Sequence, residues 1–241
     1  MRVRSRGGDS ACRPADGERG VPEPWPRGLA EPGRRSGGRR AAHGALDGDG
    51  AAPRWIVDPL DGTTNFSHGL PFFSVSIACE VEGTLRAAVV CAPALGWTFS
   101  AVRGGGAFRN GEPVAVSRTA ALERALLATG FPYDRRTSED NNLAQFAALE
   151  RRVQGVRRAG SAALDLAMVA CGWFDGYWEK KLKAWDVAAG ILLVQEAEGR
   201  VSDYGGGPVD LQRCEVLATN GPLHGPLMEA LAEVPRGAQL R

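Results

Sequence analysis

The sequence has few cysteines and no long apolar run, and these absences exclude several classes of protein. Its five cysteines are scattered, odd in number and without a C-x-x-C pair, so neither a disulfide framework nor a zinc site is indicated. No apolar run approaches the length needed to span a bilayer, and no apolar signal-peptide core follows the first residues. We therefore expect a soluble protein of the reducing cytoplasm.

The chain also has almost no net charge. Its 29 lysine and arginine residues nearly balance 28 aspartate and glutamate residues, and a formal net charge of +1 gives no general argument for a nucleic-acid or membrane partner. With 241 residues and 44% hydrophobic content, the chain can form one large or two modest domains with a sizeable core.

Residues 1–53 lack apolar periodicity and are dominated by Arg, Gly, Pro, Ala and Asp. Three interpretations remain open. The segment could be a basic arm that contacts nucleic-acid phosphates, although Trp25 is its only aromatic ring. It could stay solvated and disordered, because such a composition buries little surface. It could also be a wrong-frame translation of GC-rich DNA, which translating the other two frames would test.

A strand followed by two acids and a turn forms the most informative stretch. The apolar run from Trp55 to Val57 predicts a buried strand, and Pro59 and Gly62 predict a tight turn. The turn would place Asp58 and Asp61 on one side, where their carboxylates could bind hard divalent cations. Asp-Pro and Asp-Gly are also common turn dipeptides, so the short match alone would equally fit a plain turn.

Backbone groups of the same turn supply further candidate ligands. The Leu60 carbonyl could not join a strand ladder there and is available as a third oxygen. Gly62 and Thr63 offer backbone N–H groups where a helix could begin, which is a natural seat for a phosphate.

From residue 54 the pattern predicts two parts. Residues 54–117 should form an antiparallel meander that carries the acidic turn, and residues 118–241 should form an α/β part. Strands are expected at 73–81, 84–92, 96–102, 107–108, 113–116, 125–129, 156–157, 174–181, 201–204 and 216–219. Helices are expected from a cap at Thr137 or Ser138 to Val153, after Ser161, at 187–198 and at 222–234.

Two longer signatures carry a family resemblance. The stretch from Asp58 to Phe73 resembles the first signature of the inositol monophosphatase family of metal-dependent phosphatases. Trp185 to Gly190, followed by Glu196 to Gly199, resembles the second, and the resemblance covers about Arg54 to Val234. It implies an α/β fold, a layered αβαβα sandwich of the inositol monophosphatase and fructose-1,6-bisphosphatase type.

The segment ahead of the first signature departs from the family. Family members carry two helices and a Gly-Glu-Glu turn there, with a metal-binding glutamate some 20 residues before the aspartate that matches Asp58. Arg34 to Arg40 contains no acid, so the helices and the glutamate are missing or replaced. Asp47 and Asp49 could stand in for the glutamate; without it, we expect weak binding of one metal and little activity. Without the helices, one apolar face of the sheet should be uncovered.

The second part carries the remaining candidate site residues. From the sequence alone, Ser161 reads as a helix N-cap and Glu179 as an exposed strand acid. By resemblance, Gly160, Ser161 and Ala162 would line the substrate hydroxyls, and Glu179 would hydrogen-bond the sugar-alcohol ring.

Asp186 reads from the sequence alone as a helix-capping acid. By resemblance it joins Asp58 and Asp61 around the second metal, and both Asp61 and Asp186 also contact the substrate. Lysines at 180, 181 and 183 would lie on the rim and attract an anion. Histidines at 43, 68 and 224 have no ligand spacing, and we interpret them as loop or surface residues.

The resemblance implies hydrolysis of a phosphate monoester with two or three Mg²⁺ ions. Asp58 would bridge two ions, the Leu60 carbonyl would bind the first, and Thr63 would orient the attacking water while its amide and that of Gly62 hold the phosphate. Inositol 1-phosphate is the expected substrate; histidinol phosphate, fructose bisphosphate and nucleotide 3′-phosphates are alternatives, as is a silent relative that binds macromolecules. Lithium inhibition, a homodimer and roles in inositol metabolism and signalling are implied by resemblance only.

Overall fold

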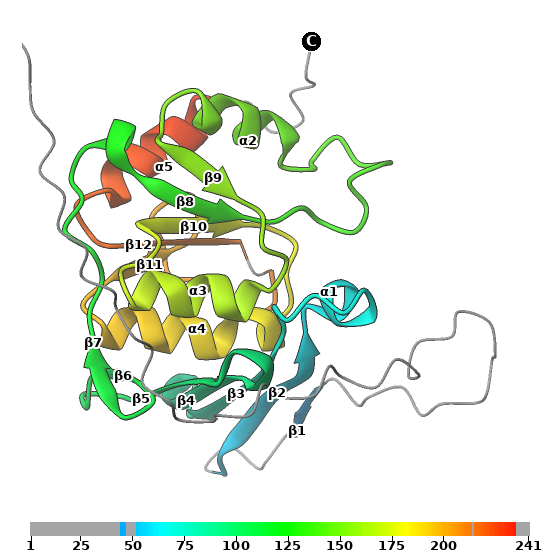
Figure 1. Cartoon of the computed structure of the whole chain (residues 1–241), viewed down its shortest axis with the longest axis vertical. Coiled ribbons are helices and arrows are strands. Elements are labelled where there is room, and N and C mark those ends of the chain that lie inside the picture. The colour runs from blue at the N-terminus through cyan, green and yellow to red at the C-terminus, as the bar shows by residue number, and fades with distance from the viewer. Residues whose placement is uncertain (1–43, 47–51, 214, 235–241) are drawn as a thin grey trace, which may run out of the picture. The chain divides into compact units, whose positions relative to one another are not determined.

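The structure is a computed structural model that describes residues 44–46, 52–213 and 215–234. These residues belong to one compact unit, Arg39–Arg241, built from two sheets with helices between and beside them (Figure 1). The first sheet has the strand order β1-β2-β3-β4-β5-β6-β7, and every neighbouring pair is antiparallel. Its strands are β1 (Gly44–Leu46), β2 (Arg54–Asp61), β3 (Ser74–Val81), β4 (Thr84–Ala92), β5 (Trp97–Val102), β6 (Ala107–Arg109) and β7 (Glu112–Val114).

Tight turns explain why the first sheet is a meander. Glu82 and Gly83 have φ values of 50° and 71°, and Asn110 and Gly111 have values of 50° and 85°. Two successive residues with positive φ form the hairpin turn that matches the twist of antiparallel strands. The predicted strands on either side of both turns are confirmed, and β4 has the bounds expected from the sequence.

The second sheet mixes parallel and antiparallel pairs in the order β11-β12-β10-β8-β9. Its strands are β8 (Leu126–Thr129), β9 (Gly155–Arg157), β10 (Gly176–Glu179), β11 (Arg200–Ser202) and β12 (Val216–Thr219). β8 pairs in parallel with both β9 and β10, whereas β12 is antiparallel to β10 and β11. The helices are α1 (Thr63–Ser67), α2 (Leu143–Glu150), α3 (Ala162–Ala170), α4 (Ala184–Glu196) and α5 (His224–Ala232), with short 3-10 turns at Pro93–Leu95 and Leu122–Arg124.

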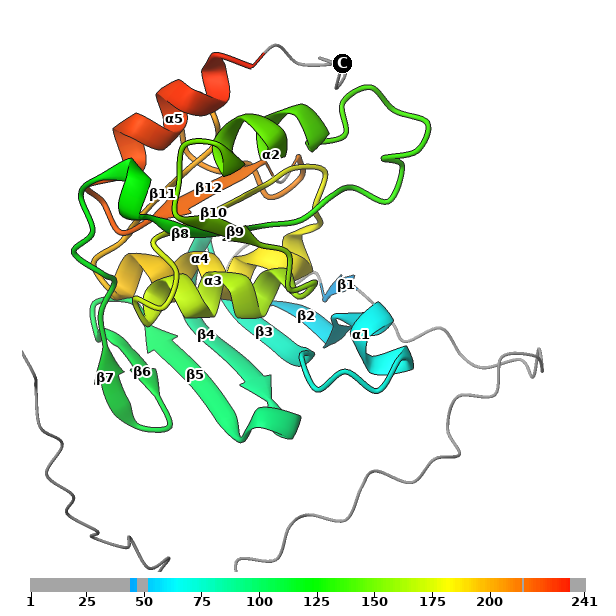
Figure 2. The ribbon, with the colours of Figure 1, turned by 45° about the horizontal axis from the view of Figure 1, so that its top comes forward.

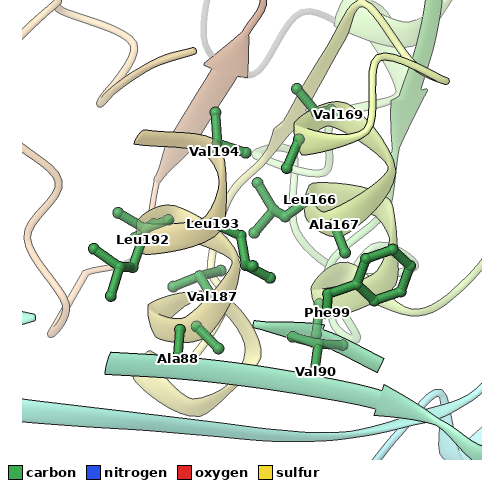
Figure 3. Close-up of a cluster of buried hydrophobic side chains, with 14 of the residues drawn as sticks. Ala88, Val90, Phe99, Leu166, Ala167, Val169, Val187, Leu192, Leu193 and Val194 are labelled. Atoms are coloured by element: carbon green, nitrogen blue, oxygen red, sulfur yellow. The ribbon is translucent and has the colours of Figure 1, made fainter. Parts of the chain in front are cut away.

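Helices α3 and α4 form the layer between the two sheets, and α2 and α5 cover the far face of the second sheet (Figure 2). The interior of the molecule therefore lies around α3 and α4. Figure 3 shows Val90 and Phe99 of the first sheet facing this layer, with Leu166 of α3 and Leu193 of α4 packed nearby. These four side chains are fully buried, and burying a side chain of this size stabilises the fold by roughly 1.5–3 kcal/mol. The described residues thus form four layers of the expected αβαβα sandwich.

The outer face of the first sheet carries exposed apolar side chains. Trp55, Val89 and Val102 are 46%, 37% and 60% exposed, respectively. Among the described residues, no helix lies on this face (Figure 2). None of the helices in the described part of the chain is long and apolar enough to cross a membrane.

Helix α2 and strand β1 are among the elements that differ from the sequence-based predictions. Helix α2 begins at Leu143, not at Thr137 or Ser138, because the amides of those two residues close a turn on the Asp134 carbonyl. Strand β1 lies within residues 1–53, where no strand pattern was found; its three residues are too few to show a periodicity, and it is held by pairing with β2.

The interpretation of His224 as a surface residue is wrong. Its side chain is 1% exposed, at the start of α5. Nε2 lies 2.9 Å from the Ser202 hydroxyl and Nδ1 lies 3.0 Å from the Thr219 hydroxyl, so both ring nitrogens have partners inside the protein. Burial lowers the pKa of His224 to about 4, and the nearby charge of Arg200 adds to this effect. His68 lies just after α1 and is exposed, as predicted, and His43 is outside the described residues.

Candidate metal centre

Strand β2 continues to Asp61 rather than ending at Val57, and it contains an irregularity at the two aspartates. Asp58 pairs with Ser76 and Asp61 pairs with Ser74, so three steps along β2 match two steps along β3. A bulge of one extra residue keeps both aspartates on the same face, where regular alternation would separate them. Both are buried, with 4% and 9% exposure. The predicted tight turn is therefore a bulge within a strand, and it has the predicted effect on the two carboxylates.

Asp186 lies in the first turn of α4 rather than opening the helix. The helix begins at Ala184, and Asp186 Oδ2 accepts a 2.8 Å hydrogen bond from the Lys183 backbone N–H. The Ser76 hydroxyl donates to the Trp185 carbonyl at 3.2 Å, which ties the start of α4 to β3. The expected capping role and the location beside β2 are thus combined in one residue.

The carboxylates of Asp58, Asp61 and Asp186 converge although they come from distant parts of the chain. One oxygen from each lies within 4.8 Å of the others. The pKa of Asp61 is raised to about 7 and that of Asp186 to about 6, chiefly by burial. The charges of neighbouring carboxylates contribute to both shifts, and hydrogen bonds from Ser161, Ala163 and Lys183 oppose them. A divalent cation between the three groups would remove this repulsion, so the donor set fits Mg²⁺.

Asp61 is fixed by the beginning of α3. Its Oδ2 accepts hydrogen bonds from the Ser161 hydroxyl at 2.6 Å and from the Ala163 backbone N–H at 2.9 Å. The same Ser161 oxygen accepts from the Leu164 N–H at 3.4 Å, so Ser161 is the N-cap predicted from the sequence. Because Ser161 is 1% exposed, its hydroxyl faces Asp61 rather than an open pocket.

The turn after β2 begins a short helix, as predicted. Gly62 has a φ of 83°, and a Cβ there would lie 2.9 Å from the Phe72 carbonyl oxygen, so both conformation and space favour glycine. The exposed Thr63 hydroxyl donates to the Leu60 carbonyl at 2.9 Å, and the Leu60 N–H donates to Asp58 Oδ1 at 3.0 Å. The candidate backbone oxygen and the candidate catalytic hydroxyl therefore lie next to each other.

Asn65 contributes to the site but is not among the candidate residues predicted from the sequence. Its Nδ2 donates to the carbonyls of Phe72 and Ala159 at 2.7 and 2.8 Å. This joins α1 to the turn at Gly160, which has a φ of 91° and would carry a Cβ only 3.2 Å from Asn65 Nδ2. Ala162, 8% exposed, follows at the first position of α3. The position of Asn65 within the first signature is the sequence feature that could have indicated it as a site residue.

Glu179 is not an exposed strand acid. It lies at the end of β10 and is 8% exposed, and the other three residues of this strand are buried as well. Burial raises the pKa of Glu179 to about 7, a hydrogen bond from Tyr177 opposes the rise, and the charges of Asp186 and Asp61 add to it. Its carboxylate therefore lies within electrostatic range of the metal centre.

Two of the three lysines expected on the rim are occupied in ion pairs. Lys180 is 4% exposed and pairs with Asp140. Lys181 Nζ lies 2.9 Å from Asp134 Oδ2 and also donates to the Ser138 hydroxyl at 2.8 Å. Both lysines hold the segment between β8 and α2. The prediction that Lys180 lies on the rim is wrong, because Lys180 is buried, whereas Lys181 and Lys183 are exposed.

The acids considered as substitutes for the family glutamate cannot be placed. Asp47 and Asp49 lie outside the described residues, as does the stretch from Arg34 to Arg40. Cysteines 79, 91 and 171, which lie in the described part, are free thiols.

Comparison with known proteins gives one family. The model of the inositol monophosphatase family matches residues 35–236, which begins before the resemblance seen at Arg54. An inositol-1-monophosphatase of Synechocystis is 49% identical over 185 residues, 77% of this chain and 64% of that protein. A Nus factor SuhB of Pseudomonas aeruginosa is 50% identical over 175 residues, 72% of this chain and 65% of that protein.

A solved structure shows the same fold. The inositol monophosphatase from Anabaena (Nostoc) aligns with a TM-score of 0.74 and 49% identity, covering 76% of this chain and 75% of that one. The chain spans less than two thirds of the length of the Synechocystis and Pseudomonas relatives. With a family match over most of its residues and three buried aspartates converging at its centre, this chain belongs to the inositol monophosphatase family.

Proposed function

We propose that this protein hydrolyses phosphate monoesters of small polyols with Mg²⁺, and that inositol 1-phosphate is its preferred substrate. The observation that carries the proposal is the meeting of Asp58, Asp61 and Asp186 within 4.8 Å. Buried carboxylates at this spacing are suited to holding divalent cations. The relative from Synechocystis, named an inositol-1-monophosphatase, supports the choice of substrate.

Asp58, Asp61, Asp186 and the Leu60 carbonyl are the groups that would hold two or three Mg²⁺ ions. When bound, such ions neutralise phosphate charge and make water a better nucleophile near neutral pH. The family resemblance implies that Asp58 would help to hold more than one of these ions, and on that ground we assign it as catalytic. The bulge in β2 positions Asp58 and Asp61, and the N-terminal turn of α4 positions Asp186.

The turn after β2 is assigned to the phosphate. The backbone N–H groups of Gly62 and Thr63 would donate hydrogen bonds to its oxygens. The Thr63 hydroxyl, which now donates to the Leu60 carbonyl, would orient the attacking water opposite the leaving oxygen. Holding the two reactants in line lowers the entropy cost of the reaction.

The polyol would lie toward β10 and the start of α3. Glu179, Asp61 and Asp186 would accept hydrogen bonds from its hydroxyls, and Gly160 and Ala162 would border it through their backbone. Ser161 would act mainly through Asp61, because its hydroxyl already donates to that carboxylate. Glu179 is thus a buried carboxylate within electrostatic range of Asp186 and Asp61 but outside the ligand set.

Hydrolysis of inositol 1-phosphate with Mg²⁺, measured as phosphate release, tests the proposal. Wild-type protein should release phosphate, and the Asp61→Asn variant should be reduced on the order of 100-fold or more, because changing even an outer partner of a metal site costs 10–100-fold. A panel with histidinol phosphate, fructose bisphosphate and a nucleotide 3′-phosphate checks the substrate. No phosphate release above the Asp61→Asn background would refute hydrolysis by this chain.

A second candidate function is the binding of another macromolecule by a catalytically silent family member. The Pseudomonas relative, which is named a Nus factor, is the observation that favours it. The absence of an acid from Arg34 to Arg40, where the resemblance implies a metal-binding glutamate, points the same way. Lithium inhibition and a homodimer remain predictions from the family, to be measured in the same assay and by sedimentation.

A further inference from the structure

We infer that Tyr177 and Gly130 are positioning residues for Glu179, and that together they make the site select phosphate esters with a hydroxyl-bearing leaving group. The inference rests on the proposed function, because it assigns Glu179 to the polyol. It concerns two residues that belong neither to the acidic cluster nor to either of the two signatures.

Tyr177 fixes Glu179 from within the core. The two residues are separated by one position on β10, so their side chains extend from the same face of the strand. The Tyr177 ring is fully buried, and its hydroxyl donates a 2.5 Å hydrogen bond to Glu179 Oε2. A buried phenol needs a hydrogen-bond partner, and Glu179 supplies it. The contact uses Oε2, so Tyr177 does not occupy Oε1, the other oxygen of the carboxylate.

Gly130 provides the space in which the Glu179 carboxylate lies. A Cβ added at this position would overlap both carboxylate oxygens and the carboxylate carbon. The backbone there cannot easily give way, because Asn142 Nδ2 donates to the Gly130 carbonyl at 2.7 Å. The Thr129 hydroxyl also donates to the Trp178 carbonyl at 2.6 Å, which locks this point of β8 to β10. Any side chain at position 130 would therefore have to move Glu179.

A third feature near Glu179 is a buried acid, Asp165. Asp165 of α3 is 2% exposed, and its Oδ1 has no hydrogen-bond partner among the described residues. The charges of Glu179 and Asp61 both act on Asp165, which places it near both groups. Rotation of Glu179 toward Asp165 would bring two acids together in a buried site, which disfavours that rotation.

A carboxylate held in this way distinguishes leaving groups. Fixed acceptors bind a substrate hydroxyl well and gain nothing from a leaving group that lacks one. Inositol 1-phosphate has five free hydroxyls on the ring that bears its ester, whereas phenyl phosphate has none, so only the hydrolysis of inositol 1-phosphate should depend on the position of Glu179.

The test compares these two esters in the wild type, Tyr177→Phe and Gly130→Ala, with Tyr204→Phe as a control for loss of a phenol elsewhere. Loss of one hydrogen bond should raise KM for inositol 1-phosphate about 3- to 10-fold in Tyr177→Phe, with kcat within about twofold. Gly130→Ala should raise KM for inositol 1-phosphate more than Tyr177→Phe does. KM for phenyl phosphate should change less than about twofold in both variants. In a Glu179→Gln background, Tyr177→Phe should have no further effect, because both act through one carboxylate.

Equal changes for the two esters, or none, would overturn the inference, as would an undiminished effect of Tyr177→Phe in the Glu179→Gln background. A wild type that hydrolyses phenyl phosphate but prefers it to inositol 1-phosphate also overturns it, while leaving hydrolysis intact. If the wild type hydrolyses neither ester, the proposed function fails. The inference is then tested by calorimetry, which measures the affinities of the same variants for both esters. A selective loss of affinity for inositol 1-phosphate supports the inference, and an equal loss overturns it.

Discussion

Ser161 and Asp61 are joined by a 2.6 Å hydrogen bond between residues 100 positions apart in the sequence. Ser161 is also the N-cap of α3. One hydroxyl therefore connects the stability of the central helix layer with the position of a carboxylate in the metal centre.

Replacing Ser161 should weaken both functions of this hydroxyl. Ser161→Ala should lower the free energy of unfolding by about 1–2 kcal/mol, which is typical for the loss of an N-cap. It should also reduce Mg²⁺ affinity on the order of 10-fold, because a partner that orients a ligand is lost. Urea denaturation and calorimetry measure the two effects. Ser161→Thr, which keeps a hydroxyl, is the matched control, and normal Mg²⁺ affinity in Ser161→Ala would contradict the assignment.

Binding of Mg²⁺ should stabilise the wild type and have little effect on Asp61→Asn. The three carboxylates repel one another without a cation, and an ion that binds only the folded chain raises its stability by mass action. At 100 times the dissociation constant the gain should be about 2.7 kcal/mol. Thermal unfolding with EDTA and with excess Mg²⁺ measures this difference, and an equal rise in Tm for both proteins would place the ion elsewhere.

His224 should make the protein sensitive to mild acid. Burial lowers its pKa from 6.5 to about 4. Between these values the unfolded chain binds a proton that the folded chain does not, so stability is present above about 6.5 and is lost as the pH falls through 4. The loss should be on the order of 3 kcal/mol.

Urea denaturation between pH 4 and pH 7 measures this loss. His224→Gln, which cannot titrate, should be less stable at pH 7 but should show a shallower dependence on pH. The same slope in both proteins would show that other groups, and not this imidazole, account for the acid sensitivity.

The ion pair of Lys180 and Asp140 should respond differently to the loss of each partner. The Lys180 side chain is 4% exposed, whereas that of Asp140 is 42% exposed. Asp140→Ala leaves a buried, unpaired ammonium group and should cost about 3 kcal/mol. Lys180→Met leaves a carboxylate that water can reach and should cost less than about 1 kcal/mol. Denaturant unfolding of the two variants checks the order, and equal or reversed costs would contradict it.

Most of the fold could be predicted from local patterns in the sequence. The alternation in Thr84–Ala92 and the Asn110-Gly111 turn determine their strands without help from distant residues. The meeting of Asp58, Asp61 and Asp186 could be predicted only by resemblance, because no local pattern connects β2 with α4.

The incorrect predictions concern residues whose environment depends on distant partners. Lys180 is buried because Asp140 neutralises it, and His224 is buried because the hydroxyls of Ser202 and Thr219 satisfy its ring nitrogens. Polarity alone places both side chains in water. Tyr177 likewise looks like an ordinary strand aromatic until its hydrogen bond to Glu179 is known.

The extra residue in β2 makes the metal centre sensitive to chain length. The step from Asp58 to Asp61 places both acids inward only while Ser76 and Ser74 remain opposite them. Inserting one residue between the two acids, or shifting β3 by one position, would point one carboxylate toward the outer face of the sheet. Relatives that keep every acid but differ in length at residues 58–61 should therefore lose the metal, just as those that lose an acid do.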